Sequence, residues 1–308
     1  MARGDDIAAP APFGQQRNLK SFDAMKNFLL LACLVCCGLP MKAEEGGNDD
    51  YQLVWFDDFD VDGLPNSDNW SFEEGYVRNR EAQWYQVNNA YCRNGILTLT
   101  ARKEVLPNPD FNSKSADWRK LRPQILYTSS SITTKEKHEF LFGRIEVRAR
   151  IPATPGTWPT IRLLGKKYTW PSCGEINLME FNEYHGVSSI LASVCWAGNE
   201  DTSEWDIAAY PFSKFTQADP LWASKFHVWR MDWNANSIKI FVDDVLLNVT
   251  SLMQTYNAQT SAGADDNPFE TPMHIVLSLA LGSSGGYIDE QTLPAHFEID
   301  YIKVYQKP

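Results

Sequence analysis

Two glutamates and an asparagine stand close together in a stretch whose other residues are mostly apolar. Glu175, Asn177 and Glu180 lie within six residues, separated by aliphatic residues and methionine. This alternation is typical of a strand with one buried and one solvated face. Two carboxyl groups about 5–5.5 Å apart allow a retaining glycosidase to use one as nucleophile and the other as general acid and base. The plain alternative is an ordinary strand with solvent-facing glutamates.

The spacing of the two glutamates requires an irregular strand. Side chains alternate along a strand, so Glu175 and Asn177 share a face. Glu180 follows Glu175 by five residues, an odd offset that sends it to the opposite face of a regular strand. One β-bulge near Leu178 or Met179 returns the side chain of Glu180 to the face of Glu175. The stretch therefore predicts a bulged strand on which all three polar residues point into the same space.

The surrounding sequence predicts many further strands to position these residues. Apolar residues alternate with charged ones over residues 142–152, which indicates a half-buried strand. The polar and aromatic residues 201–221 are predicted to form a loop. Many short strands at close spacing favour a β-sandwich. Other predicted strands cover residues 79–85, 95–102, 190–196, 226–233, 237–242, 274–281 and 297–305.

The catalytic stretch and the residues before it resemble the active-site signature of glycoside hydrolase family 16. The match consists of Gly156-Thr-Trp-Pro159, then Trp170-Pro-x-x-Gly-Glu175-Ile-Asn-Leu-Met-Glu180. It is closer to the laminarinase-like branch, whose pattern E-x-D-x-x-E is the bulged form. The resemblance covers roughly residues 51–306. It implies an all-β fold, a concanavalin-like jelly-roll sandwich with a substrate cleft on the concave sheet.

The resemblance also implies a role for each polar residue of the signature. Glu175 is expected to be the nucleophile and Glu180 the acid/base, with Asn177 in the place of the family's middle Asp. Physical chemistry supports this division, because an anionic Glu175 raises the pKa of Glu180 and keeps it protonated near neutral pH. The amide of Asn177 is expected to hydrogen-bond Glu175 but adds no charge. We therefore expect activity that is weaker or shifted in its pH optimum.

The same resemblance implies a set of substrate-binding residues. Two tryptophans precede the glutamates and can stack on sugar rings. An N-x-E-x-Q motif at residues 79–83 matches the one with which family members contact sugar hydroxyls at the cleft edge. Arg162 stands where the family usually has a second Trp. The predicted substrate-binding residues are Asn79, Glu81, Gln83, Trp158, Arg162, Trp170 and Trp196.

A structural calcium ion is a further implication of the resemblance. Family members often bind Ca²⁺ on the convex side through an acidic residue of the first strand, a backbone carbonyl and an Asp of the last strand. Asp58, Gly95 and Asp300 are the matching positions. Carboxylate and carbonyl oxygens suit Ca²⁺. Ordinary surface acids are the alternative, and we expect no cofactor in the catalytic chemistry itself.

Composition narrows the class of partner. The 308 residues include 11 Trp and 12 Tyr and are 44% hydrophobic, which is enough for a core and an aromatic cleft. The net charge is −11 and no basic patch is visible, which argues against nucleic acid and anionic membranes. It also disfavours a sulfated polysaccharide and favours a neutral β-glucan. We expect a monomer.

The N-terminal residues resemble a targeting signal. Residues 25–43 have a basic start, an apolar run and then small residues, as in a secretory signal peptide, and the run is too short for a membrane span. Residues 1–24 are predicted to be a disordered extension, and residues 51–308 a single catalytic domain. We expect a secreted, periplasmic or cell-surface protein. Leu30-Leu-Ala-Cys33 loosely resembles a lipoprotein cleavage box, so lipid anchoring stays an alternative.

The predicted function is a secreted retaining endo-β-glucanase acting on β-1,3 or mixed β-1,3/1,4 glucan by double displacement. Two alternatives remain. A galactan hydrolase of the agarase or carrageenase type shares the bulged motif, and a non-catalytic β-glucan-binding lectin shares the fold. A pure binder has no need of both Glu175 and Glu180, so the pair favours an enzyme.

Overall fold

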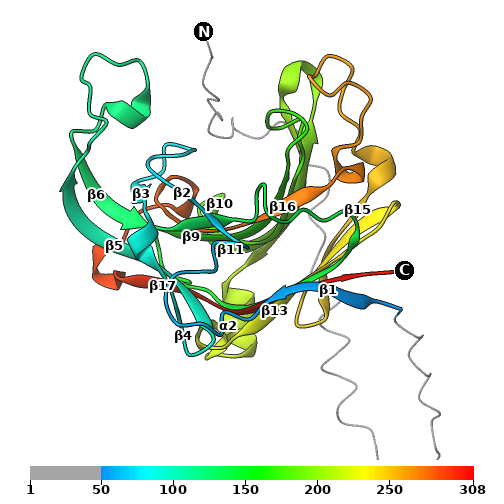
Figure 1. The fold of residues 1–308 in the computed structure, drawn as a ribbon, viewed down its shortest axis with the longest axis horizontal. Helices are drawn as coiled ribbons and strands as arrows, with labels where there is room; N and C mark the ends of the chain where they lie inside the picture. Colours follow the sequence, from blue (N-terminus) through cyan, green and yellow to red (C-terminus); the bar gives the residue numbers. More distant parts are fainter. Residues whose placement is uncertain (1–49) are drawn as a thin grey trace, which may run out of the picture.

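Strands with apolar residues at alternate positions build the whole architecture. The computed structural model describes residues 50–308; the predicted extension and signal peptide lie outside the described residues. The described chain forms two stacked sheets, antiparallel except for the parallel pair at residues 83–85 and 127–129, with one hydrophobic core between them (Figure 1). This confirms the all-β sandwich.

The larger of the two sheets, called here the outer sheet, lies behind the cleft. Its strands follow the order β15 (Val245–Ser251), β14 (Ser237–Val242), β13 (His227–Trp233), β8 (Gly143–Arg150), β17 (Ala295–Gln306), β5 (Ile96–Pro107), β6 (Gln124–Ser129) and β3 (Gln83–Tyr85), with β1 (Gln52–Asp57) paired to β17 and β4 (Ala90–Arg93) to β5. Along β8 the apolar residues are buried and the charged ones half-exposed, as the alternation predicts. Trp229 and Trp233 of β13 fill the core with large, fully buried rings.

The second sheet, called here the cleft sheet, carries the candidate site. Its order is β12 (Ser203–Pro211), β11 (Val187–Ala197), β10 (Glu175–Tyr184), β9 (Thr157–Gly165), β16 (Met273–Leu281), β7 (Ser131–Thr133) and β2 (Ser71–Glu73). Figure 1 shows the loop between β5 and β6 and the loop between β15 and β16 rising at opposite ends of this sheet.

Helical segments of the described chain are short. They are α2 (Ser213–Ala218) and the 3₁₀ turns η1 (Val87–Asn89), η2 (Trp118–Lys120), η3 (Asn199–Asp201), η4 (Trp222–Ser224), η5 (Leu252–Gln254), η6 (Pro268–Glu270), η7 (Ser283–Gly285) and η8 (Glu290–Thr292). None is long enough to form a layer, although Phe215 of α2, Trp222 of η4 and Phe269 of η6 are buried in the core.

Two predicted elements are wrong. Residues 201–221 are not a loop: they form β12 and α2, because the backbone of β12 pairs with β11 along its whole length. The predicted strand at residues 79–85 is confined to Gln83–Tyr85. Asn79 and Arg80 have φ values of 56° and 51°, a left-handed turn that a strand does not allow.

Candidate active site

Strand β10 brings the two glutamates to one face, as predicted. Its register shifts between Asn177 and Glu180 against β11, and between Asn177 and Met179 against β9. This is the β-bulge that the odd spacing requires. Ile176 and Leu178 point into the core, while Glu175 and Glu180 line a cleft on the other face. Apolar residues anchor the strand and leave both carboxyl groups toward the cleft.

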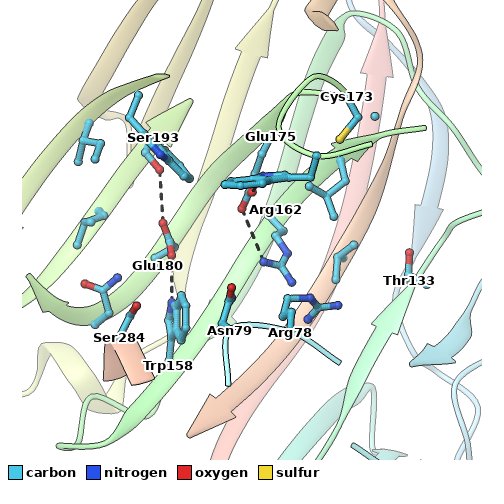
Figure 2. A pocket seen from close by; sticks show the side chains of 18 of the residues that line it. Arg78, Asn79, Thr133, Trp158, Arg162, Cys173, Glu175, Glu180, Ser193 and Ser284 are labelled. Atoms are coloured by element: carbon cyan, nitrogen blue, oxygen red, sulfur yellow. Dashed lines mark hydrogen bonds and ion pairs between the residues drawn. The ribbon is translucent and has the colours of Figure 1, made fainter. Parts of the chain in front are cut away.

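Each glutamate accepts a hydrogen bond from its own tryptophan. The Trp158 indole N–H donates to Glu180 Oε1 at 3.0 Å, and the Trp170 indole N–H donates to Glu175 Oε2 at 2.8 Å. Arg162 Nη1 lies 3.6 Å from Glu175 Oε1 as an ion pair (Figure 2). Both tryptophans and Arg162 line the cleft, as predicted. Their interactions with the glutamates, which the sequence does not show, fix the orientation of both carboxyl groups.

The two carboxyl groups have different electrostatic environments. Burial, and secondly the neighbouring Glu175 carboxylate, raise the pKa of Glu180 to about 7. The predicted direction is confirmed, although burial is the larger cause. Glu175 has the cation of Arg162 beside it, 3.6 Å from its Oε1. The arrangement places a protonated acid next to a carboxylate near neutral pH, as acid/base and nucleophile roles require.

Asn177 does not make the predicted contact with Glu175. Its amide Nδ2 instead donates to Ser193 Oγ at 3.1 Å. Ser193 Oγ in turn donates to Glu180 Oε2 over a long 3.4 Å (Figure 2). The strand register explains the change, because Asn177 pairs directly with Ser193 across β10 and β11. Asn177 therefore acts through Ser193 on the acid/base.

We expect Asn177→Asp to move the alkaline limb of the pH–rate profile upward by about one pH unit. An aspartate accepts from Ser193, so the hydroxyl no longer donates to Glu180. That bond lowers the pKa of Glu180, and its loss together with the added negative charge raises it. Ser193→Ala is the matched control, since it removes the bond without adding charge and is expected to give a smaller upward shift. An unchanged limb in both variants, measured as kcat/KM against pH, would contradict this coupling.

Of the three polar residues of the N-x-E-x-Q motif, one lines the cleft and two are buried beside it. Asn79 lines the cleft, but Glu81 and Gln83 are only 3% and 1% exposed. Glu81 accepts hydrogen bonds from Asn79 Nδ2 at 3.2 Å and from Gln83 Nε2 at 2.7 Å, and Gln83 Oε1 accepts from the backbone N–H of Leu281. The prediction that Glu81 and Gln83 contact sugar hydroxyls is thus replaced by a role in holding Asn79.

The structure adds cleft residues that sequence reasoning missed and, besides Glu81 and Gln83, removes a third that it named. Trp196 packs against the core and does not line the cleft. Its neighbour Cys195 pairs with Glu175 and therefore shares the face of the sheet that Glu175 occupies, so Trp196 lies on the opposite face of β11. Trp205 lines the cleft and was missed because residues 201–221 were predicted to be a loop. Trp205 and Ile207 are two residues apart, and this alternation, typical of a strand, was the available signal in the sequence. The other missed lining residues include Glu73, Arg78, Lys135, Ser193 and His274.

The predicted calcium ligands are only partly together. A Cβ at Gly95 would lie 3.8 Å from the backbone oxygen of Asp58, so these two positions adjoin. The Asp300 carboxylate, however, accepts a hydrogen bond from Arg148, which competes with a cation. Within residues 50–308 no cluster of three or more acidic, His or Cys side chains could hold a metal ion. The set does not fit calcium without rearrangement, so this site stays a prediction and enters no chemical step.

Comparisons with known proteins agree with this geometry. A family model described as glycosyl hydrolases family 16 matches residues 78–303. The β-glucanase of Rhodothermus marinus is 29% identical over 299 residues, covering 90% of this chain and 93% of that protein.

Solved structures also align with most of this chain. The laminarinase catalytic domain of Thermotoga maritima aligns with a TM-score of 0.67 and 30% identity over 84% of this chain and 100% of that one. A structure from work on the endo-acting O-glycanases with which human gut bacteria initiate mucin breakdown aligns with a TM-score of 0.74 and 31% identity, over 84% of this chain and 92% of that one.

Proposed function

The chain belongs to glycosyl hydrolase family 16 and is a glycoside hydrolase, and from this premise we propose that it is a retaining endo-β-glucanase. Its substrate in this proposal is β-1,3 or mixed β-1,3/1,4 glucan. The β-glucanase and the laminarinase that it resembles support this substrate class. The single observation that carries the proposal is the pair of buried carboxyl groups on the bulged strand, one beside Arg162 and the other with a pKa of about 7.

The proposed reaction has two steps. In the first, Glu180 donates its proton to the leaving glycosidic oxygen while the Glu175 carboxylate bonds to the anomeric carbon. The ester has no charge, so one cause of the raised pKa of Glu180 disappears and the residue becomes a better base. In the second, Glu180 takes a proton from water, whose oxygen displaces Glu175 and restores the starting state.

Release of reducing ends tests this function. We expect the protein to release them from laminarin or from barley-type mixed-linkage glucan, and Glu175→Gln to abolish the release. Proton NMR of the first product is expected to show the β-anomer before mutarotation, since double displacement retains configuration. The α-anomer would exclude the retaining mechanism. Binding to glucan without any release would indicate the lectin.

A second candidate is a hydrolase of galactose-containing glycans. The alignment with work on O-glycanases favours it, as does Arg162, which offers a cation where an aromatic stacking surface was expected. Release from agarose or from mucin glycans, with none from laminarin, would establish this candidate. The catalytic roles of Glu175 and Glu180 are the same in both cases.

We also propose that the protein is secreted and acts as a monomer. The support is the signal-like sequence at residues 25–43, which lies outside the described residues. Among residues 50–308, no helix has the length and apolar character needed to cross a bilayer. N-terminal sequencing of protein from the culture medium tests the first point, because a start after residue 43 requires cleavage. Light scattering tests the second.

A further inference from the structure

Three buried side chains in the cleft have a nitrogen without a hydrogen-bond partner among residues 50–308. The atoms are Arg78 Nη1, Arg162 Nε and His274 Nδ1. The side chains are 7%, 6% and 5% exposed, and all three line the cleft that holds Glu175. A buried charged donor is unfavourable without an acceptor. A partner is therefore expected from a bound molecule.

Arg78 is fixed in place by one edge of its guanidinium. Its Nη2 donates to Glu73, and Glu73 also accepts from Ser131 Oγ at 2.6 Å. Burial would raise the pKa of Glu73, but Arg78 and then Arg162 outweigh it and lower the pKa to about 2. Glu73 is therefore ionised at all working pH values. The ion pair holds Arg78 rigidly and leaves Nη1 for another partner.

Arg162 has equally few partners. Its one ion pair within the described chain is that with Glu175, and at 3.6 Å this is longer than a hydrogen bond. It lies on the cleft floor between Asn177 of β10 and Val276 of β16. Figure 2 shows the guanidinium groups of Arg162 and Arg78 in neighbouring positions, on the side of Glu175 away from Glu180. Two cations with unpaired N–H groups thus face the same part of the cleft.

Cationic and acidic side chains gather together in this part of the cleft. Lys135 lines it as a third cation, whereas Glu73 and Glu175 supply two negative charges. Glu81 lies beneath as a third acidic side chain, and burial raises its pKa. Burial and then Lys135 lower the pKa of His274 to about 4, so its ring is neutral. The local balance differs from the chain's net charge of −11, from which a neutral substrate was predicted.

We propose that Arg78 and Arg162, with Lys135 and His274 beside them, form a subsite for an oxyanion carried by the substrate. The subsite receives the sugar bound on the side of Glu175 away from Glu180. This inference rests on the proposed function, because it takes those two residues as the reaction centre. The oxyanion is a sulfate ester or a carboxylate of a uronic acid.

The chemistry of the free atoms favours an oxyanion over a sugar hydroxyl. Guanidinium groups donate and never accept, so a group that offers several acceptors and no donor is the best complement. Sulfate and carboxylate meet this condition, and their hydrogen bonds to arginine are charge-assisted. A hydroxyl offers fewer acceptor positions and would leave some of these N–H groups unpaired.

Calorimetric titration with sodium sulfate tests the subsite independently of the glycan. The full chain is compared with Arg78→Lys and Arg162→Lys, which keep the charges beside Glu73 and Glu175 but lose the free N–H groups, and with Arg150→Lys on the outer sheet. At constant ionic strength set with chloride, we expect sulfate to bind and each cleft variant to weaken binding about tenfold or more, with Arg150→Lys unchanged. Equal binding by all four proteins means an adventitious ion only and overturns the proposal.

Sodium acetate and modified glucans then distinguish the two oxyanions. Binding of sulfate alone assigns a sulfate ester, and binding of acetate alone assigns a carboxylate. On laminarin sulfated or oxidised at C6, we expect the native protein to prefer the matching derivative over plain laminarin, and Arg162→Lys to lose that preference about tenfold. Normal cleavage of laminarin without oxyanion binding would overturn the subsite alone. Oxyanion binding without cleavage of any glucan would overturn the proposed function alone.

Discussion

Replacement of Glu175 by alanine is expected to lower kcat/KM on glucan by about 10⁴-fold or more, because no other group in the cleft can form the glycosyl ester. When sodium azide is added to this variant, azide fills the space left by the carboxylate and attacks the face of the anomeric carbon that Glu175 attacks in the native protein. Product analysis by NMR is therefore expected to show an α-glycosyl azide, with its configuration inverted relative to the β-linked substrate. The same addition to Glu180→Ala is expected to give the β-azide, since the ester on Glu175 forms first and azide displaces it.

Glu183→Gln is the matched control for the nucleophile. Glu183 lies on the same strand and lines the same cleft, but it stands beyond the bulge and outside the catalytic pair. We expect this variant to lose less than about tenfold in kcat/KM. A β-azide from Glu175→Ala, or a rate near that of the native protein, would exclude Glu175 as the nucleophile. The unfolding midpoint of each variant separates lost chemistry from lost folding.

The sequence predicts the catalytic pair well because its constraint is local. Glu180 follows Glu175 by five positions, and the apolar residues between them must stay in the core. Only a bulge meets both conditions, so the geometry follows from the spacing. The same local logic identified the strands of the core, whose alternation needs no knowledge of distant residues.

The contacts that tune the pair depend on residues distant in sequence and were not predictable in the same way. Asn177 meets Ser193 because of the register between β10 and β11, and no pattern within either strand reveals that register. Trp205 reaches the cleft from an edge strand whose alternation is weak. Asn79 and Arg80 adopt a turn that the even spacing of residues 79–83 conceals.

Net charge does not describe the cleft, for a related reason. It sums side chains over the whole surface, whereas a ligand responds to the few that face it. The sequence gives −11 in total, but Arg78, Lys135 and Arg162 meet in one part of the cleft from three separate segments. Only the fold brings them together, so composition alone does not show which charges a ligand meets in the cleft.

Replacement of Glu180 by glutamine is expected to separate acid catalysis from nucleophilic attack. On laminarin, whose leaving group needs a proton, we expect kcat/KM to fall about 10³-fold. On a 2,4-dinitrophenyl β-laminarioligosaccharide, whose leaving group needs none, the first step is expected to change less than about tenfold, followed by slow hydrolysis of the ester. A burst of dinitrophenol measures the two steps in one experiment.

The pH profile gives an independent readout of the same residue. Glu180 must be protonated for the first step, so native kcat/KM is expected to fall as pH rises through about 7, the pKa that burial and Glu175 set. Glu180→Gln is expected to remove this alkaline limb. Trp158→Phe keeps the acid but removes a hydrogen bond that lowers its pKa, so the limb is expected to move upward. A limb near pH 7 that persists in Glu180→Gln would assign the titration to another group, and the raised pKa of Glu180 would then have no part in the reaction.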